Sequence, residues 1–141
     1  MITDTTKKKM ALFLREFFGS TSGKVKFGTG GGGTNPTSTT LDTPLPTSTD
    51  SDTTSSSSDD KVVEFRGTFT GTELQGYTIR EVGFFGDVPT DAEMADIDSA
   101  SFDATGVDEK ENIMLSRINF DAIGNFSTSD TIEVIYTMEV E

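Results

Sequence analysis

The first eighteen residues carry apolar positions with the period of an amphipathic helix. Within residues 4–18, DTTKKKMALFLREFF, apolar side chains recur three and four positions apart, which places them on one face. That face consists of Met10, Phe13, Leu14, Phe17 and Phe18. We expect Asp4 to cap the start of this helix and Gly19 to end it in a left-handed conformation. The apolar face packs either on the chain's own sheet or on another subunit, so these five residues are candidate assembly contacts.

From Lys61 onward the apolar period changes from that of a helix to two, which indicates strands. VVEFRGTF places Val63, Phe65 and Phe69 on one face, and YTIREVGFFG follows after a turn at TGTELQG. ENIMLSRINF then places Met114, Ile118 and Phe120 on one side. The clearest alternation is in TIEVIYTMEV, whose apolar face is Ile132, Val134, Tyr136, Met138 and Val140. With a short strand at residues 24–29, the pattern predicts a mainly β fold of about five strands, a small antiparallel sheet or sandwich.

Two segments interrupt this pattern. Residues 30–60 are almost entirely Gly, Thr, Ser, Asp and Pro, so they have little apolar area with which to offset the entropy of ordering. We expect a long loop or linker there, with Leu41 and Leu45 as its apolar anchors. A second, acidic segment at residues 87–110 is expected to be a surface loop with a helical turn around DAEMAD. The predicted organisation is therefore a helix and first strand at 1–29, a linker at 30–60 and a β domain at 61–141.

The glycine run in FGTGGGGTNP raises the question of a phosphate-binding loop. Gly28 and Gly33 have the spacing of the two glycines of a Walker loop, and Thr34 follows them, but the lysine is missing. No helix pattern follows, so no helix N-terminus would point at an anion. We therefore expect a glycine hinge at the end of a strand, with an architectural role and no nucleotide.

The acidic segment offers carboxylates at a density that suggests calcium. Asp96, Asp98, Asp103 and Asp108 lie close together in the sequence, and carboxylate oxygens suit this cation. However, an EF-hand loop counted from Asp96 would need glycine and glutamate where Ser101 and Val107 stand. A solvated acidic loop without a specific metal is the better expectation.

Composition narrows the classes of function further. The chain of 141 residues has a net charge of −13 and contains neither cysteine nor histidine. Disulfides, thiolate or histidine metal sites and histidine-dependent triads are therefore excluded. The only cluster of positive charge is Lys7, Lys8 and Lys9, which argues against nucleic acid. No segment is long and apolar enough to span a membrane, and the acidic surface is typical of solubility or of adaptation to concentrated salt.

Paired carboxylates of a hydrolase would have to face a cleft, and coincidental pairs are unavoidable among 24 acidic residues. Glu81 is the notable one because it lies between apolar neighbours in YTIREVGFF. We expect it to be half-buried and paired with Arg80 or Arg117. No catalytic residue, cofactor or metal ligand is predicted.

The order of several short motifs resembles a group of small structural proteins of tailed viruses. In that group a G-x-G-x-x-x-P stretch precedes D-T-x-L, and an I-x-E-x-G-[LF]-[FY] signature is followed by a leucine-alanine-arginine strand, where this chain has serine at the alanine position. The matching signature residues here are Ile79, Glu81, Gly83, Phe84, Phe85 and Arg117. The earlier stretches correspond to Gly28, Gly30, Pro36, Asp42, Thr43 and Leu45, with five residues in place of three between Gly30 and Pro36. Leu115 and Phe120 match the later strand, so the resemblance covers most of the chain.

What the resemblance implies is a non-enzymatic, β-rich adaptor of the tail, baseplate or fibre-attachment region, assembled in the host cytoplasm into the virion. Its partners would be copies of itself and neighbouring virion proteins, with no nucleic acid and no membrane. With the acidic composition, it suggests a virus of a halophilic archaeon. Two alternatives remain open: a capsid-surface decoration, vertex turret or neck component, and a host-surface or glycan-binding module, for which Phe102 is the one loop aromatic available.

Overall fold

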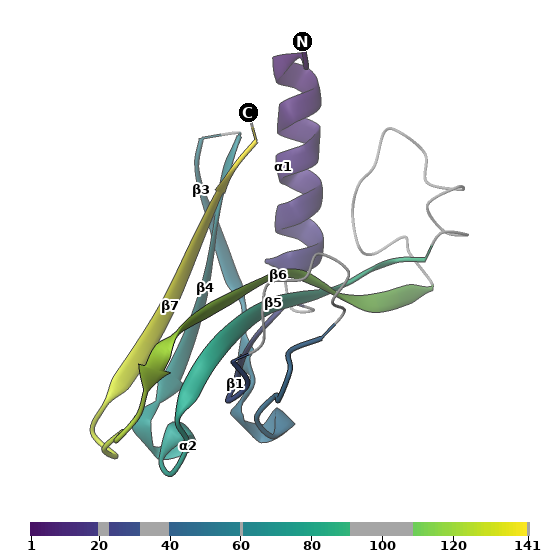
Figure 1. Ribbon diagram of the computed structural model, residues 1–141. Helices are drawn as coiled ribbons and strands as arrows, with labels where there is room; N and C mark the ends of the chain where they lie inside the picture. Colours follow the sequence, from purple (N-terminus) through teal and green to yellow (C-terminus); the bar gives the residue numbers. More distant parts are fainter. Residues whose placement is uncertain (20–22, 32–39, 60, 91–108, 141) are drawn as a thin grey trace.

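In the described part of the chain, seven strands form two antiparallel sheets that pack face to face, with one long helix at their margin (Figure 1). The computed structural model describes residues 1–19, 23–31, 40–59, 61–90 and 109–140. The first sheet has the order β2-β1-β5-β6, from β1 (Lys24–Gly28), β2 (Ser51–Asp52), β5 (Ile79–Pro89) and β6 (Lys110–Ile123). The second has the order β3-β4-β7, from β3 (Thr54–Asp59), β4 (Val62–Thr70) and β7 (Thr131–Glu139). The predicted mainly β, sandwich-like fold is confirmed.

The core lies between the two sheets and is rich in phenylalanine. Phe27 on β1 meets Phe69 on β4 with ring centroids 4.5 Å apart, and Phe84 on β5 meets Tyr136 on β7 at 4.7 Å. The alternation predicted for the last strand is confirmed, since Ile132, Val134, Tyr136 and Met138 are half-buried and the residues between them, Ile135 included, are exposed. Side chains therefore interdigitate across the sandwich as the period of two requires.

Gly67 on β4 sets how closely the two sheets approach. A Cβ atom at this position would lie 2.6 Å from Cγ2 of Val25 on β1, well inside contact distance. The glycine thus leaves room for a fully buried valine of the opposite sheet.

The prediction of a loop or linker at residues 30–60 is wrong for the second half of that segment. The segment contains a short 3₁₀ helix, η1 (Thr47–Thr49), and then strands β2 and β3, which belong to different sheets. The chain crosses between the sheets at Thr53, whose amide donates to the carbonyl of Gly23 at 2.9 Å. A Ser/Thr tract without apolar residues becomes a strand here because β4 supplies the ladder partners.

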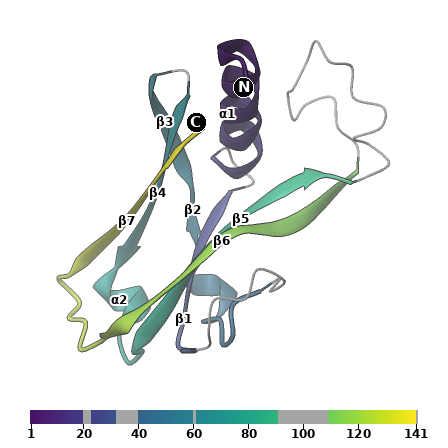
Figure 2. The same ribbon diagram turned by 45° about the horizontal axis from the view of Figure 1, so that its top comes forward.

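Helix α1 (Asp4–Phe18) stands beside the sandwich and touches it mainly through its last turns, against β4 and β5 (Figure 2). Its N-cap is Thr3, whose hydroxyl accepts from the amide of Thr6, and not the predicted Asp4. Asp4 instead forms an ion pair of 2.9 Å with Lys61. The predicted left-handed stop is also wrong, because Gly19 has φ −112° and ψ 2°. Gly86 on β5 allows the helix end to approach, since a Cβ there would lie 2.1 Å from the carbonyl oxygen of Phe17.

The turn after β4 contains a one-turn helix, α2 (Gly71–Leu74), that the sequence analysis described only as a turn. Thr70 and Glu73 form a reciprocal capping box, a signal that was present in the sequence as T-x-x-E. Gly76 then reverses the chain with φ 87°. The predicted turn around DAEMAD and the four aspartates considered for calcium lie outside the described residues.

Candidate functional site: a buried clasp and an open seam

The signature residues of the sequence analysis converge on a buried carboxylate. Glu81 on β5 is fully buried. Its Oε1 accepts from the amide of Thr43 at 2.9 Å and its Oε2 from the amide of Asp42 at 3.1 Å. These amides belong to residues 40–45, which we name the strap because they cover the end of β1 and the face of β5. The expectation that Glu81 would be half-buried and paired with an arginine is wrong.

Arg117 on β6 holds the strap from the other side. Its Nη1 lies 3.5 Å from Oδ1 of Asp42 and donates to the carbonyl of Thr40 at 3.4 Å. Arg80, the other candidate partner, is exposed. Backbone amides, therefore, and not a guanidinium, satisfy the buried carboxylate, as buried polar groups require.

Gly28 and Gly30 let the strap and the carboxylate approach the end of β1. A Cβ at Gly28 would lie 2.2 Å from Oε1 of Glu81, and one at Gly30 would lie 2.4 Å from Cβ of Asp42. The strap also pairs with this strand end, through Thr29 N–H to the carbonyl of Thr43 at 2.9 Å and Leu45 N–H to that of Phe27 at 3.0 Å. These two glycines thus have an architectural role, as the sequence analysis expected, and the expected anchors Leu41 and Leu45 are both buried.

The other signature positions pack around this arrangement. Gly83 leaves room for Leu41 of the strap and for the ring of Phe85. Lys26 lies over the Phe85 ring at 4.7 Å from its centroid, while Ile79 and Phe84 face the core. We name the whole set, with Glu81, Arg117, Gly28, Gly30 and the strap, the clasp. Both oxygens of its carboxylate are engaged by amides within the fold, which suits a structural role better than proton transfer.

Asp50 lies close to the clasp face, beside Lys26, whose Nζ is 3.6 Å from Oδ2 of Asp50. Burial raises the pKa of Asp50, because lost hydration outweighs the attraction of Lys26. The folded state therefore holds this proton more tightly than the unfolded chain. The stability that Asp50 contributes is fully present below its unfolded pKa and is lost as pH rises through the raised folded value.

Asp50→Asn should consequently change how stability depends on pH. Relative to the original chain, the variant is expected to gain in free energy of unfolding as pH rises from about 4 to about 7. Urea unfolding at constant ionic strength measures this difference. A relative loss of the variant over the same range would contradict the effect of burial.

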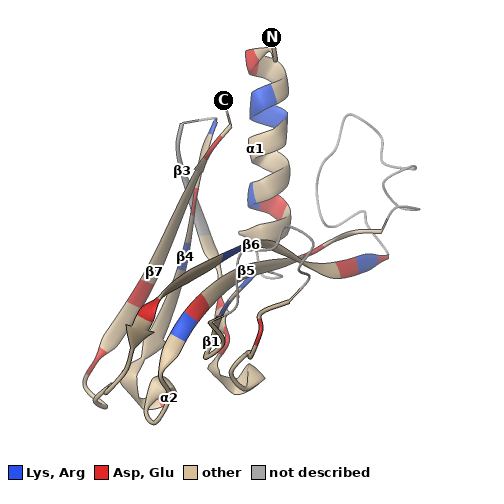
Figure 3. Ribbon diagram, in the orientation of Figure 1, with Lys and Arg blue, Asp and Glu red and all other residues tan. Residues whose placement is uncertain are grey.

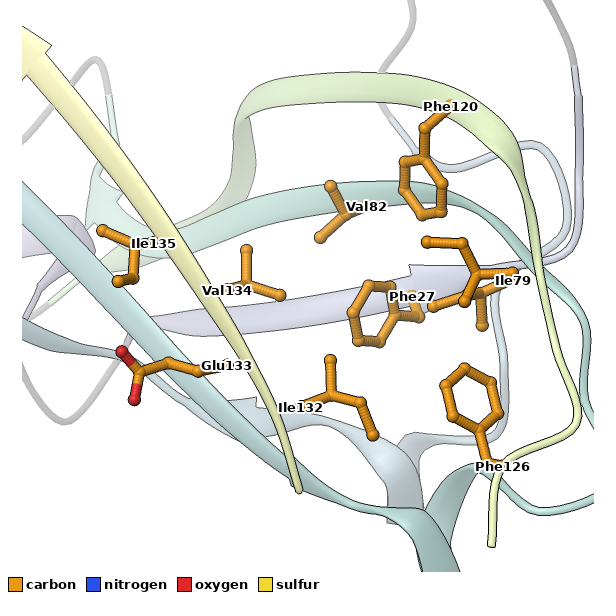
Figure 4. A pocket seen from close by; sticks show the side chains of 10 residues that line it. Phe27, Ile79, Val82, Phe120, Phe126, Ile132, Glu133, Val134 and Ile135 are labelled. Atoms are coloured by element: carbon orange, nitrogen blue, oxygen red, sulfur yellow. The ribbon is translucent and has the colours of Figure 1, made fainter. Parts of the chain in front are cut away.

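The second feature is an open seam between the terminal strands of the two sheets. β6 ends the first sheet and β7 ends the second, among the strands that the structure describes. Between them lies a groove of about 340 Å³ with an almost wholly apolar lining. Its inner residues point toward one another (Figure 4) and come from both sheets: Phe27, Ile79, Val82, Phe120, Phe126 and Ile132.

Glu133 is the one acidic residue at this groove, and its side chain points away from the apolar cluster (Figure 4). Its carboxylate accepts from Nη1 of Arg66 at 3.0 Å, so it forms an ion pair on the outer face of the second sheet. Large apolar side chains are exposed along the same edges: Ile113, Ile118 and Ile123 on β6 and Ile135 on β7. Sequence reasoning missed this seam, although isoleucine on the polar side of the last strand was a visible signal.

The predicted assembly face of the helix divides into two parts. Phe17 and Phe18 are buried in the chain's own core, and Phe13 and Leu14 pack partly against it. Met10 remains 45% exposed. Beyond it the helix presents Lys7, Lys8 and Lys9 on a chain whose strands carry many acidic positions (Figure 3). Of the five residues, Met10 is thus the one whose side chain is available to another subunit.

Among the described residues, no three acidic, histidine or cysteine side chains gather into a group that could hold a metal ion. None of the helices in the described ranges is long and apolar enough to cross a membrane. Comparisons with protein-family models, curated proteins and solved structures found no match to this chain.

Proposed function

We propose that the chain is a non-enzymatic structural subunit of a tailed virus, an oligomeric adaptor of the tail, baseplate or fibre-attachment region. The observation that carries the assembling role is the open seam, where two edge strands flank an apolar groove. The motif order of the sequence supports the location in a virion.

Uncovered strand edges are a liability for a protein that works alone. Their backbone donors and acceptors are templates for pairing, and monomeric proteins usually blunt them with lysine, proline or a covering loop. β6 has 14 residues, of which Lys110 and Arg117 are the only basic ones and none is proline. Arg117 is turned to the strap. Such an edge suits a protein whose neighbours cover it in an assembly.

The clasp supports the same proposal from another direction. It uses an ionisable side chain, two glycines and a strap to stiffen one end of the first sheet, and its carboxylate is out of reach of solvent. A rigid scaffold with an exposed seam is expected of a structural subunit. A hydrolase that uses paired carboxylates would instead present its catalytic carboxylate to a cleft.

Purified virus particles from the source of this chain provide the direct test. Mass spectrometry of the particles should detect the chain in multiple copies, and a reconstruction should place it in the tail, baseplate or fibre-attachment region. A position at the capsid surface or neck would correct the location. Absence from particles, with the chain found free in infected cells, would overturn the proposal.

Association should also depend on salt in a definite direction. Each copy carries a net charge of −13, so copies repel one another in dilute buffer. At about 1 M salt the Debye length is about 3 Å, which removes most of that repulsion. Light scattering should therefore show a higher mass at molar salt than at about 0.05 M. A monomer at every salt concentration, or oligomers that dissociate as salt rises, would contradict self-assembly.

A further inference from the structure

Among the strands that the structure describes, β6 offers the longest edge. It spans Lys110–Ile123 and pairs on one side with β5, while its other side faces no described strand. Ile113, Ile118 and Ile123 along it are 39%, 41% and 50% exposed. An occupant of this edge must satisfy backbone donors and acceptors and cover apolar side chains, and an extended strand does both.

A second copy of β6 meets both requirements, because it is an extended strand with exposed isoleucines. Two copies of one strand can pair antiparallel about a two-fold axis perpendicular to the sheet. The residue at the axis then lies opposite the same residue of the other copy. An axis at Ile118 sets Ile118 against itself. By residue number it also brings Ile113 toward Ile123 of the other copy, so the exposed isoleucines come together. Arg117 then faces Asn119, so no like charges are opposed beside the axis.

Placing the axis at a neighbouring residue gives less favourable pairs of side chains. An axis at Ser116 opposes Glu111 to Asp121, and an axis at Arg117 opposes that arginine to its own copy. An axis at Asn119 leaves Ile113 beyond the end of the partner strand. Ile118 also lies in a stretch, Ser116 to Asn119, that pairs with β5 without a register shift. The backbone is regular at these four residues, and register shifts of the β5–β6 ladder lie on both sides of them, between Met114 and Ser116 and between Asn119 and Ile123.

We propose that a second copy of this chain binds along β6, antiparallel and about a two-fold axis near Ile118. The two four-stranded sheets then form one continuous sheet of eight strands, centred on Ile118. This inference rests on the self-assembly in the proposed function and names its surface and partner.

A single cysteine tests the geometry, because the chain has none of its own. Directly opposed residues have Cα atoms about 4.5–5.5 Å apart, within the range of a disulfide. Ile118→Cys, oxidised in molar salt, should yield a disulfide-linked dimer. Ile135→Cys is the matched control, since Ile135 is 51% exposed on the other open edge, and it should stay uncrosslinked. Equal crosslinking of both variants, or none at Ile118, would overturn the proposal.

Ile118→Glu tests the energetics by placing two carboxylates opposite each other. The dimer dissociation constant should rise on the order of tenfold or more, while Ile135→Glu leaves it unchanged. Circular dichroism should match the original chain and the midpoint of unfolding should stay close to it, because Ile118 is 41% exposed and outside the buried core. Should the original chain oligomerise and Ile118→Glu do so equally, pairing along β6 is wrong although self-assembly stands. Should the original chain remain monomeric in all salts, self-assembly itself fails.

Discussion

Replacing Glu81 with alanine is expected to lower the free energy of unfolding by about 2–5 kcal/mol. The substitution removes the acceptor of two buried amides, those of Asp42 and Thr43, and leaves both without a hydrogen bond. It also leaves a void beneath the strap, beside Gly28. Denaturant unfolding in molar salt measures the loss. Hydrogen exchange should in addition show faster exchange of the Asp42 and Thr43 amides.

Glu73→Ala is the matched control, because it removes a glutamate of the same size from the exposed capping box of α2. Its cost should be about 1 kcal/mol or less. Glu81→Gln should fall between the two, since one amide oxygen can accept from one backbone donor while the new NH₂ group opposes the other. A Glu81→Ala variant as stable as Glu73→Ala would show that the clasp contributes little to the fold.

Phe65→Ala is expected to cost about 3–5 kcal/mol. Phe65 is fully buried in the middle strand of the second sheet, where it faces Tyr136 of β7 in register with ring centroids 6.4 Å apart. The two sheets cannot collapse into the void, because the ladders on both sides of β4 fix its position. Thermal and denaturant unfolding would both report the loss.

Phe120→Ala on β6 is the variant with which the loss of stability in Phe65→Ala is compared. Phe120 is only half-buried at the open groove, so water can fill the space that its ring leaves, and the cost should be clearly smaller. Equal costs at the two positions would mean that the groove is closed in solution. That result would also count against an open seam as an assembly surface.

The clasp shows how far local pattern reasoning reaches in this molecule. Glu81 stood out in the sequence because an acid lay between apolar neighbours, and the glycines of FGTG stood out as architecture. The partners of Glu81 could not be deduced, because they are backbone amides 38 and 39 positions away that carry no side-chain signal. An arginine was the natural expectation for a buried acid, yet two amides serve as well.

The Ser/Thr tract is a strand that the pattern of apolar residues did not predict. Thr54–Asp59 has no apolar residue and therefore none of the alternation on which strand prediction depends. It forms β3 because β4 offers a free edge, so a tertiary neighbour overrides a composition that favours a loop. The same dependence on neighbours explains why helix α1 was predicted closely in its length but not in its cap and stop residues.

The sequence alone determined the helix, the alternating strands of the C-terminal half and the phenylalanines of the core, because burial imposes periods of 3.6 and two that are visible in a single chain. The tertiary structure decided which strands share a sheet, what satisfies Glu81 and which edges remain open. Those features depend on contacts between residues far apart in the chain, and a backbone hydrogen bond can be made by almost any residue, so no local pattern records them.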